Sequence, residues 1–181
     1  MNLDVRIDAL SLLLALIATG VGALVMIYSA RYFAPRASYL GRFAAVFVAF
    51  AGAMLGLVTV DNTVALYIFW ELTTVFSFLL IGHYSDRPSS RRAAIQALIV
   101  TTTGGLAMLA GIVMLGTAPG GSFSLHGLVS AALSGALRMD GVTTAAIVLV
   151  LAGAFSKSAL IPVHFWLPAA MAAPTPVSAY L

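Results

Sequence analysis

The chain consists of long apolar runs separated by short segments that carry most of its charges. A membrane-spanning helix needs roughly 20 mostly apolar residues to cross a hydrocarbon layer about 30 Å thick. The apolar runs therefore predict about five membrane-spanning helices, over residues 9–30, 43–60, 62–84, 93–115 and 142–171. We expect an all-α polytopic membrane protein in which residues 1–181 form a single transmembrane domain.

Segment 123–137 has a weaker pattern than these runs. Its leucine, valine and alanine residues recur at helical spacing, with serine and histidine between them. A short helix of this kind places its apolar stripe against the membrane and its polar residues toward water. The segment is therefore predicted to form an interfacial helix.

The last apolar segment is longer than one straight crossing needs, and it contains Lys157, Pro162 and Pro168. Proline has no N–H group for the helical hydrogen bond, and its ring crowds the carbonyl group four residues earlier. For Pro162 that carbonyl group belongs to Ser158. We therefore predict that the final helix is broken between Lys157 and Pro162, with Pro168 as a second break.

Composition agrees with a membrane protein and excludes several classes of function. Hydrophobic residues make up 61% of the chain and charged residues 8%, and the mean hydropathy is +1.05; soluble domains usually carry about 25% charged residues. A water-soluble enzyme is excluded. The absence of cysteine excludes disulfides, thiolate metal sites and iron–sulfur ligation. The net charge of +3 is too small to indicate a nucleic-acid partner.

The basic residues indicate how the chain is oriented in the membrane. Six of the eight arginines lie in the two segments that follow the first and third apolar runs. Basic residues in short loops favour the cytoplasmic side. We therefore expect a multi-pass protein of the cell membrane with its N-terminus outside. The six residues are Arg31, Arg36, Arg42, Arg87, Arg91 and Arg92.

Glu71 and Lys157 are the chain's only glutamate and only lysine, and both lie deep within apolar segments. A charge at the centre of a span costs at least about 2.5 to 3.5 kcal/mol, so such groups are usually paired, hydrated or involved in ion or proton transfer. Our hypothesis is that their proton affinities depend on their separation, because proximity stabilises both charged forms. Movement of the final helix at its break would then let Lys157 release a proton onward and let Glu71 take one up. The structural alternative is a static ion pair that joins two helices.

His164 follows Lys157 by seven residues, which is about two helical turns. A neutral imidazole there is suited to pass a proton between Lys157 and a water-filled space. The alternative is a histidine hydrogen-bonded to backbone that the nearby prolines leave free. The three histidines lack the spacing of a helical metal pair, so no metal site is predicted. The sequence also predicts no cofactor and no covalent catalysis.

Two stretches resemble a known family. They are FWELTTVFSFLLIGH at residues 69–83 and KSALIPVHFWLPAAMAAPTPVSAYL at residues 157–181. Both resemble the proton-translocating antiporter-like proteins shared by Mrp-type Na+/H+ antiporters and the membrane arm of respiratory complex I, where the L subunit is the family's representative. The stretch GRFAAVFVAFAGAMLGLV at residues 41–58 also fits, and the pattern is most similar to the large A subunit of the Mrp antiporters.

The resemblance implies roles for the residues singled out above. Glu71 would match the glutamate of the family's fifth helix and Lys157 the lysine of its broken seventh helix, a pair taken to drive proton transfer. His164 falls on a polar position just after that break. The five predicted helices would be the family's third to seventh, part of one antiporter-like repeat.

The resemblance also implies a function and partners. The expected function is proton conduction within a multisubunit Na+/H+ antiporter, a secondary transporter and not an enzyme, with Na+, H+, lipid and the other membrane subunits as partners. One alternative is the corresponding subunit of a redox-driven pump, either NADH-quinone oxidoreductase or a membrane-bound hydrogenase. The other alternative is a non-transporting remnant that only supports a complex.

The chain departs from the family pattern in two ways. Ala169 and Ala172 stand where many relatives have acidic residues, so a charge relay through that stretch is in doubt. The family sequence also continues into an eighth helix and a second inverted repeat. We therefore expect an N-terminal fragment that lacks the second repeat.

Overall fold

The computed structural model describes residues 4–33 and 39–181. In that part of the chain the regular elements are all α-helices, joined by loops that contribute two isolated β-bridges and no strand. The helices are α1 (Ala9–Tyr32), α2 (Leu40–Thr59), α3 (Thr63–Ile81), α4 (Pro88–Thr117), α5 (Leu125–Leu133), α6 (Gly141–Lys157), α7 (Trp166–Ala170) and α8 (Thr175–Tyr180).

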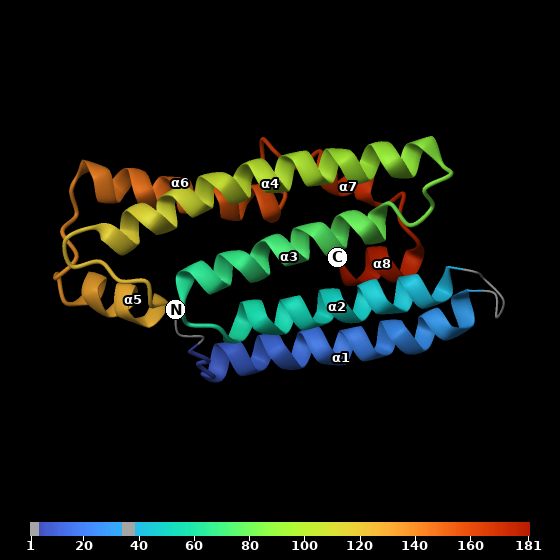
Figure 1. Cartoon of the computed structure of the whole chain (residues 1–181), viewed down its shortest axis with the longest axis horizontal. Helices are drawn as coiled ribbons and strands as arrows, with labels where there is room; N and C mark the ends of the chain where they lie inside the picture. The colour runs from blue at the N-terminus through green and yellow to red at the C-terminus, as the bar shows by residue number, and fades with distance from the viewer. Residues whose placement is uncertain (1–3, 34–38) are drawn as a thin grey trace.

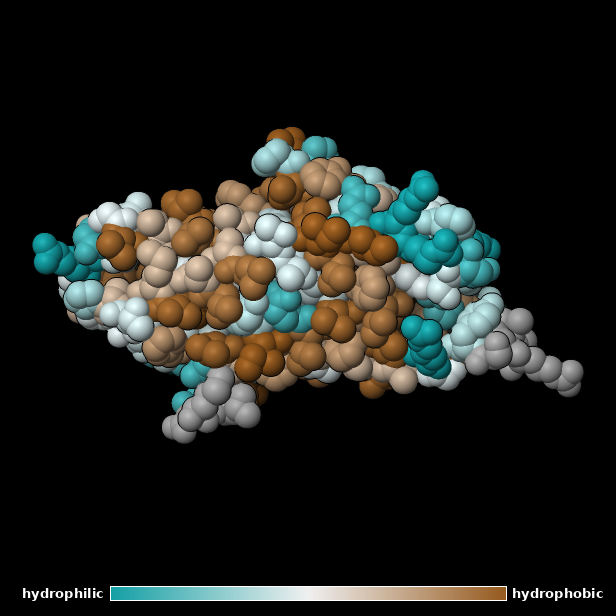
Figure 2. All heavy atoms as spheres, turned by 45° about the horizontal axis from the view of Figure 1, so that its top comes forward, coloured by the Kyte–Doolittle hydropathy of each residue, from teal (hydrophilic) through white to brown (hydrophobic). Residues whose placement is uncertain are grey.

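The long helices run side by side along the length of the molecule (Figure 1). Helices α1 to α4 are each long and apolar enough to cross a membrane, and α6 is a shorter apolar helix of 17 residues. On the face seen in Figure 2, hydrophobic residues form most of the middle of the molecule and hydrophilic residues gather at its ends. These features confirm the predicted fold class, an all-α polytopic membrane protein.

Consecutive helices pack on one another, from α1 through α2 and α3 to α4, and α6 packs along α4. The short helices close the bundle near its end, because α7 contacts α4 and α8 contacts α1. Two clusters of buried apolar side chains form the core. The first joins α1, α2 and α3 to α8 through Val25, Phe33, Phe43, Phe47, Phe50, Leu80 and Val177, and the second joins α3 and α4 to α7 through Ile81, Ala93, Ala94, Ala97, Trp166 and Ala170.

Helix α4 begins five residues before the predicted start of that span at residue 93. Pro88 stands in the first turn, where its missing N–H has no helical partner to lose and its fixed φ angle favours the helix. The apolar pattern alone did not include this turn, since it contains Arg91 and Arg92. Helix α5 is shorter than the predicted segment 123–137 and has no buried residue.

Asp61 connects three segments at one end of the bundle. Its carboxylate accepts a hydrogen bond from the Ser124 hydroxyl and one of 3.0 Å from the His126 backbone N–H. Its own N–H donates to the Asp4 carbonyl, and its carbonyl accepts from the Leu125 N–H. One aspartate thus ties the chain before α1 and the loop before α5 to the turn between α2 and α3.

We expect Asp61→Asn to lower the stability of the folded chain by about 1–2 kcal/mol above pH 5, because charge-assisted hydrogen bonds are the stronger ones. The donating hydroxyl of Ser124 holds the pKa of Asp61 below its ordinary value, although burial opposes this shift. The hydrogen bonds to the ionised Asp61 carboxylate therefore stabilise the fold at pH values above the ordinary aspartate pKa. This stabilisation is lost as the pH falls through the lowered pKa.

Thermal unfolding in detergent between pH 3 and pH 7 measures this effect. Asp86→Asn is the matched control, because Asp86 is an exposed acid in the turn between α3 and α4. Equal unfolding temperatures for both variants would contradict the role assigned to Asp61.

Candidate functional site

Helix α6 ends at Lys157 in a Schellman motif. The N–H of Leu160 donates to the Phe155 carbonyl at 3.0 Å, and the N–H of Ala159 donates to the Ser156 carbonyl at 3.3 Å. Ala159 occupies the left-handed position that this motif requires, with φ of 51°. The helix therefore ends where the sequence predicted its break.

The physical reason for the break is different from the one that the sequence suggested. Ser158, whose carbonyl group the ring of Pro162 would crowd, already lies outside the helix as its C-cap. The Schellman bonds therefore end α6 before Pro162 comes into play, and Pro162 is exposed in the following turn. The predicted second break at Pro168 is wrong, because Pro168 lies in the first turn of α7, where its missing N–H costs no hydrogen bond within that helix.

Ser156 fixes the end of α6 against two neighbouring elements. Its hydroxyl donates to the Val100 carbonyl of α4 at 2.7 Å. Its carbonyl accepts a hydrogen bond of 3.0 Å from the Trp166 indole N–H at the start of α7. Because both bonds are made by the residue that precedes Lys157, they position the lysine side chain.

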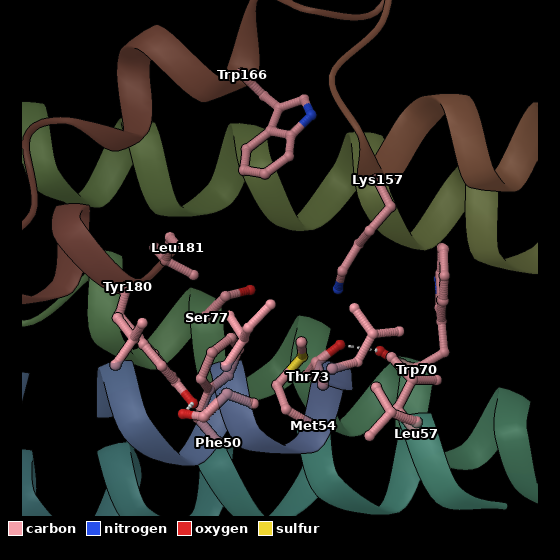
Figure 3. A pocket seen from close by; sticks show the side chains of 15 residues that line it. Phe50, Met54, Leu57, Trp70, Thr73, Ser77, Lys157, Trp166, Tyr180 and Leu181 are labelled. Carbon is pink, nitrogen blue, oxygen red and sulfur yellow. Dashed lines mark hydrogen bonds between the residues drawn. The ribbon is translucent and has the colours of Figure 1, made fainter. Parts of the chain in front are cut away.

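Lys157 extends from the end of α6 into a mainly apolar cavity of about 350 Å³ (Figure 3). The cavity lies between α1, α2 and α3, and Trp166, Tyr180 and Leu181 from the C-terminal segment also line it. The ammonium group donates a hydrogen bond of 2.8 Å to the Thr74 hydroxyl and lies 5.6 Å from the ring centroid of Trp70. The charge is therefore held on one side by a hydroxyl and an aromatic face.

Glu71 lies on α3 one turn before Thr74 and points toward Gly105 of α4. Its Oε1 atom is buried and accepts no hydrogen bond within the described residues. Lys157 donates to Thr74 and not to Glu71. The structure thus brings the amine to the turn of α3 that follows the acid, where the amine bonds to a threonine hydroxyl and not to the acid itself.

His164 lies apart from this arrangement. Its residue is exposed in the turn between α6 and α7, and it is not among the residues that line the cavity. The N–H of Leu167 donates to its carbonyl. Within the described ranges, no three His, Asp or Glu residues gather closely enough to hold a metal ion.

Sequence reasoning missed Thr74 and Trp70 as neighbours of the lysine. Thr74 follows Glu71 by three residues, so a helical reading already places both on one face of α3. Trp70 lines the cavity beside the lysine, although the sequence pattern assigned it no role. The sequence did contain a signal for both residues, because Trp70 directly precedes the single glutamate and Thr74 follows it by three residues.

Comparisons with known proteins identify the family that the sequence matches. Residues 60–181 match the family described as "NADH:quinone oxidoreductase/Mrp antiporter, TM". Residues 1–44 match the family described as "NADH-Ubiquinone oxidoreductase (complex I), chain 5 N-terminus". The first match covers all of α3 to α8, including Glu71 and Lys157.

Individual relatives agree with this match. The chain is 45% identical over its full length to the A1 subunit of a Na(+)/H(+) antiporter from Staphylococcus haemolyticus, of which it spans 22%. It is also 45% identical to the A/B subunit of a probable K(+)/H(+) antiporter from Rhizobium meliloti, of which it spans 18%.

A solved structure matches the fold as well. It is described as the structure of the Mrp complex from Dietzia sp. DQ12-45-1b, and it superimposes with a TM-score of 0.84 at 39% identity. The match covers 96% of this chain and 18% of that chain. With the family match over two thirds of its length, the chain belongs to the transmembrane family of NADH:quinone oxidoreductase and Mrp antiporter subunits.

Proposed function

We propose that this chain is the proton-conducting part of a membrane subunit in a multisubunit cation/proton antiporter. In this proposal protons pass through the Glu71 and Lys157 pair. The observation that carries it is the Lys157 ammonium group, which extends into a mainly apolar cavity and bonds to Thr74. This bond lies one turn from the Glu71 Oε1 atom, which has no hydrogen-bond partner within the described part of the chain. The names of the relatives, which are antiporter subunits and not enzymes, support the same function.

The arrangement supports proton transfer because its charges respond to small displacements. Two opposite charges that approach in a medium of low dielectric constant stabilise each other's charged form, and separation removes that stabilisation. Thr74 holds the ammonium group one turn from the carboxylate. A shift of the end of α6 toward Glu71 would favour the ion pair, and a shift away would favour release of the lysine proton.

Thr74 also provides a hydroxyl group that can accept and donate at the same time. It accepts from Lys157 at 2.8 Å, and its own O–H faces the Trp70 carbonyl at 3.3 Å. Rotation of this hydroxyl toward Glu71 would connect the amine to the acid through one bridging group. His164, which is exposed in the turn after α6 and does not line the cavity, would serve only as an outer relay to the aqueous side.

The second candidate is a membrane subunit of a redox-driven proton pump. The description of the matched family, which includes NADH:quinone oxidoreductase, favours it. In either case the partners would be other membrane subunits and lipid, and the arginine-rich loops would face the cytoplasm, with the N-terminus outside. A chain that only supports a complex would leave proton movement independent of Lys157.

Proton movement driven by a cation gradient tests the proposed function. The complete complex is reconstituted in vesicles that contain a pH-sensitive dye, and Na+ or K+ is added in turn, since the relatives are named for both ions. We expect cation-dependent proton efflux that Glu71→Gln and Lys157→Met each remove. Proton movement that depends on a quinone reductant and not on a cation would instead establish the second candidate.

Thr74→Val should lower the exchange rate about threefold to tenfold, because the valine leaves the ammonium group without its hydroxyl partner at a cost of about 1 kcal/mol. The fold should be kept, since valine and threonine have almost the same shape. The exchange rate in reconstituted vesicles measures this effect.

Thr73→Val is the matched control for this variant. Thr73 is the neighbouring buried threonine, and its hydroxyl donates only to the Trp70 carbonyl of its own helix. An equal loss of exchange in both variants would show that Thr74 acts through packing alone.

A further inference from the structure

We propose that Gly105 of α4 is a positioning residue for the Glu71 carboxylate. This inference rests on the proposed function. Gly105 lies within the helix and is buried, so no turn or unusual φ angle requires glycine there. What requires glycine is the side chain of Glu71, which fills the space beside the Gly105 Cα atom.

The contact is specific to the carboxyl end of Glu71. A Cβ atom added to Gly105 would collide with Glu71 Oε1 and would lie 3.3 Å from the carboxyl carbon. It would also lie 3.7 Å from the indole nitrogen of Trp70. The carboxyl oxygen and this indole nitrogen are both buried, and neither has a hydrogen-bond partner within the described residues. A hydrogen-bond acceptor, Glu71 Oε1, and a hydrogen-bond donor, the Trp70 indole N–H, thus both lie beside Gly105.

The preceding glycine, Gly104, has a different neighbour. A Cβ atom there would collide with Ser156 Cβ and would lie 3.5 Å from the Gly153 backbone. Successive residues of a helix point about 100° apart. Gly104 therefore lets the body of α6 approach α4, and Gly105 makes room for a side chain of α3.

This difference predicts different consequences for the two substitutions. The atom that Gly105→Ala displaces is the far end of a flexible side chain, so Glu71 can rotate away and the helices stay in place. Gly104→Ala instead meets an atom next to the α6 backbone, so the two helices must separate. A methyl group at 105 therefore moves the carboxylate with little effect on the fold.

The displacement matters for proton transfer because Thr74 holds the Lys157 ammonium group at a fixed place. A carboxylate that leaves its slot on α4 meets the amine at a different distance and angle. Misplacement of a reacting group by about 1 Å can lower a rate by roughly a hundredfold, so we expect cation-dependent exchange to fall by about tenfold to a hundredfold.

Two measurements on the complete complex test the inference. Exchange is measured in reconstituted vesicles, and the rate at which dicyclohexylcarbodiimide labels Glu71 is measured by mass spectrometry. The labelled peptide identifies the site, since Glu71 is the only acidic residue between Asp61 and Asp86. Gly105→Ala should change the labelling rate severalfold and lower exchange, while the melting temperature stays close to that of the unchanged complex.

Two further variants serve as controls. Gly52→Ala adds a methyl group in a helix where nothing lies within 4 Å, and it should change neither quantity. Glu71→Asp shortens the acid by one methylene group, so its carboxylate clears the added methyl. In the double variant, Gly105→Ala should cause no loss beyond that of Glu71→Asp alone. Gly104→Ala should lower the melting temperature of the complex. Adding Glu71→Asp to that variant should not restore the melting temperature.

The inference is overturned if Gly105→Ala leaves the labelling rate unchanged, or if its loss of exchange simply adds to that of Glu71→Asp. Glu71→Gln, measured alongside, separates this result from a failure of the proposed function. If Glu71→Gln keeps full exchange, the proposed function fails, and the labelling rate alone then decides whether Gly105 positions the carboxylate.

Discussion

Lys157→Met should reduce cation-dependent proton exchange by roughly a hundredfold or more, because a positioned acid or base commonly contributes a factor of about 10² to 10⁴ to proton transfer. Methionine keeps an unbranched, apolar stem one atom shorter than that of lysine and has no titratable group. The cavity around Lys157 is mainly apolar, so the substitution should not destabilise the fold. Dye-monitored exchange in vesicles of the complete complex measures the effect.

Lys157→Arg is the informative companion variant. Arginine keeps the positive charge and can donate to Thr74, but it does not release its proton in proteins. If the charge acts only by joining helices, arginine should restore exchange. If the lysine must release a proton, arginine should be as inactive as methionine. Full exchange in Lys157→Met would contradict the proposed function.

Glu71→Gln should have an effect of similar size on exchange. Glutamine has the shape of glutamate and no titratable proton, so a path that runs through the carboxyl group should lose about a hundredfold in rate. The variant should also be at least as stable as the unchanged chain, because Glu71 Oε1 has no hydrogen-bond partner within the described residues and a charge there is costly.

A loss of activity together with unchanged or increased stability distinguishes a functional acid from a structural one. A static ion pair with Lys157 would give the opposite result, since removal of one member of a buried pair is strongly destabilising. Asp86→Asn, in the exposed turn after α3, is the control for a general effect of removing an acid. Exchange that survives Glu71→Gln in an assembled complex would disprove the path through this residue.

The fold class followed from the sequence because membrane helices leave a strong pattern. An apolar run of about 20 residues has few alternatives to a spanning helix. The ends of the helices were harder to place, since capping depends on single side chains. Asn62 caps α3 by accepting from the N–H groups of Val64 and Ala65, and Pro88 starts α4 within an arginine-rich turn.

The candidate site could be predicted from the sequence only in part. Glu71 and Lys157 could be predicted because each is a single charge within an apolar run, and the sequence alone shows both the residue type and its location. The hydroxyl that accepts from the amine and the glycine that lies against the carboxylate depend on how α3, α4 and α6 are rotated against one another. That rotation is set by packing, which one sequence without relatives does not specify.

The left-handed conformation of Ala159 has a consequence for movement at the end of α6. For a residue with a Cβ atom this conformation costs about 1–2 kcal/mol, whereas a right-handed one would continue the helix. Local preference at Ala159 therefore favours extending α6 by a few residues, up to the restriction that Pro162 places on the residue before it, and the indole bond from Trp166 to Ser156 opposes this extension. Displacement of that indole would let α6 lengthen beyond Lys157, so a movement at the start of α7 would change the surroundings of the amine.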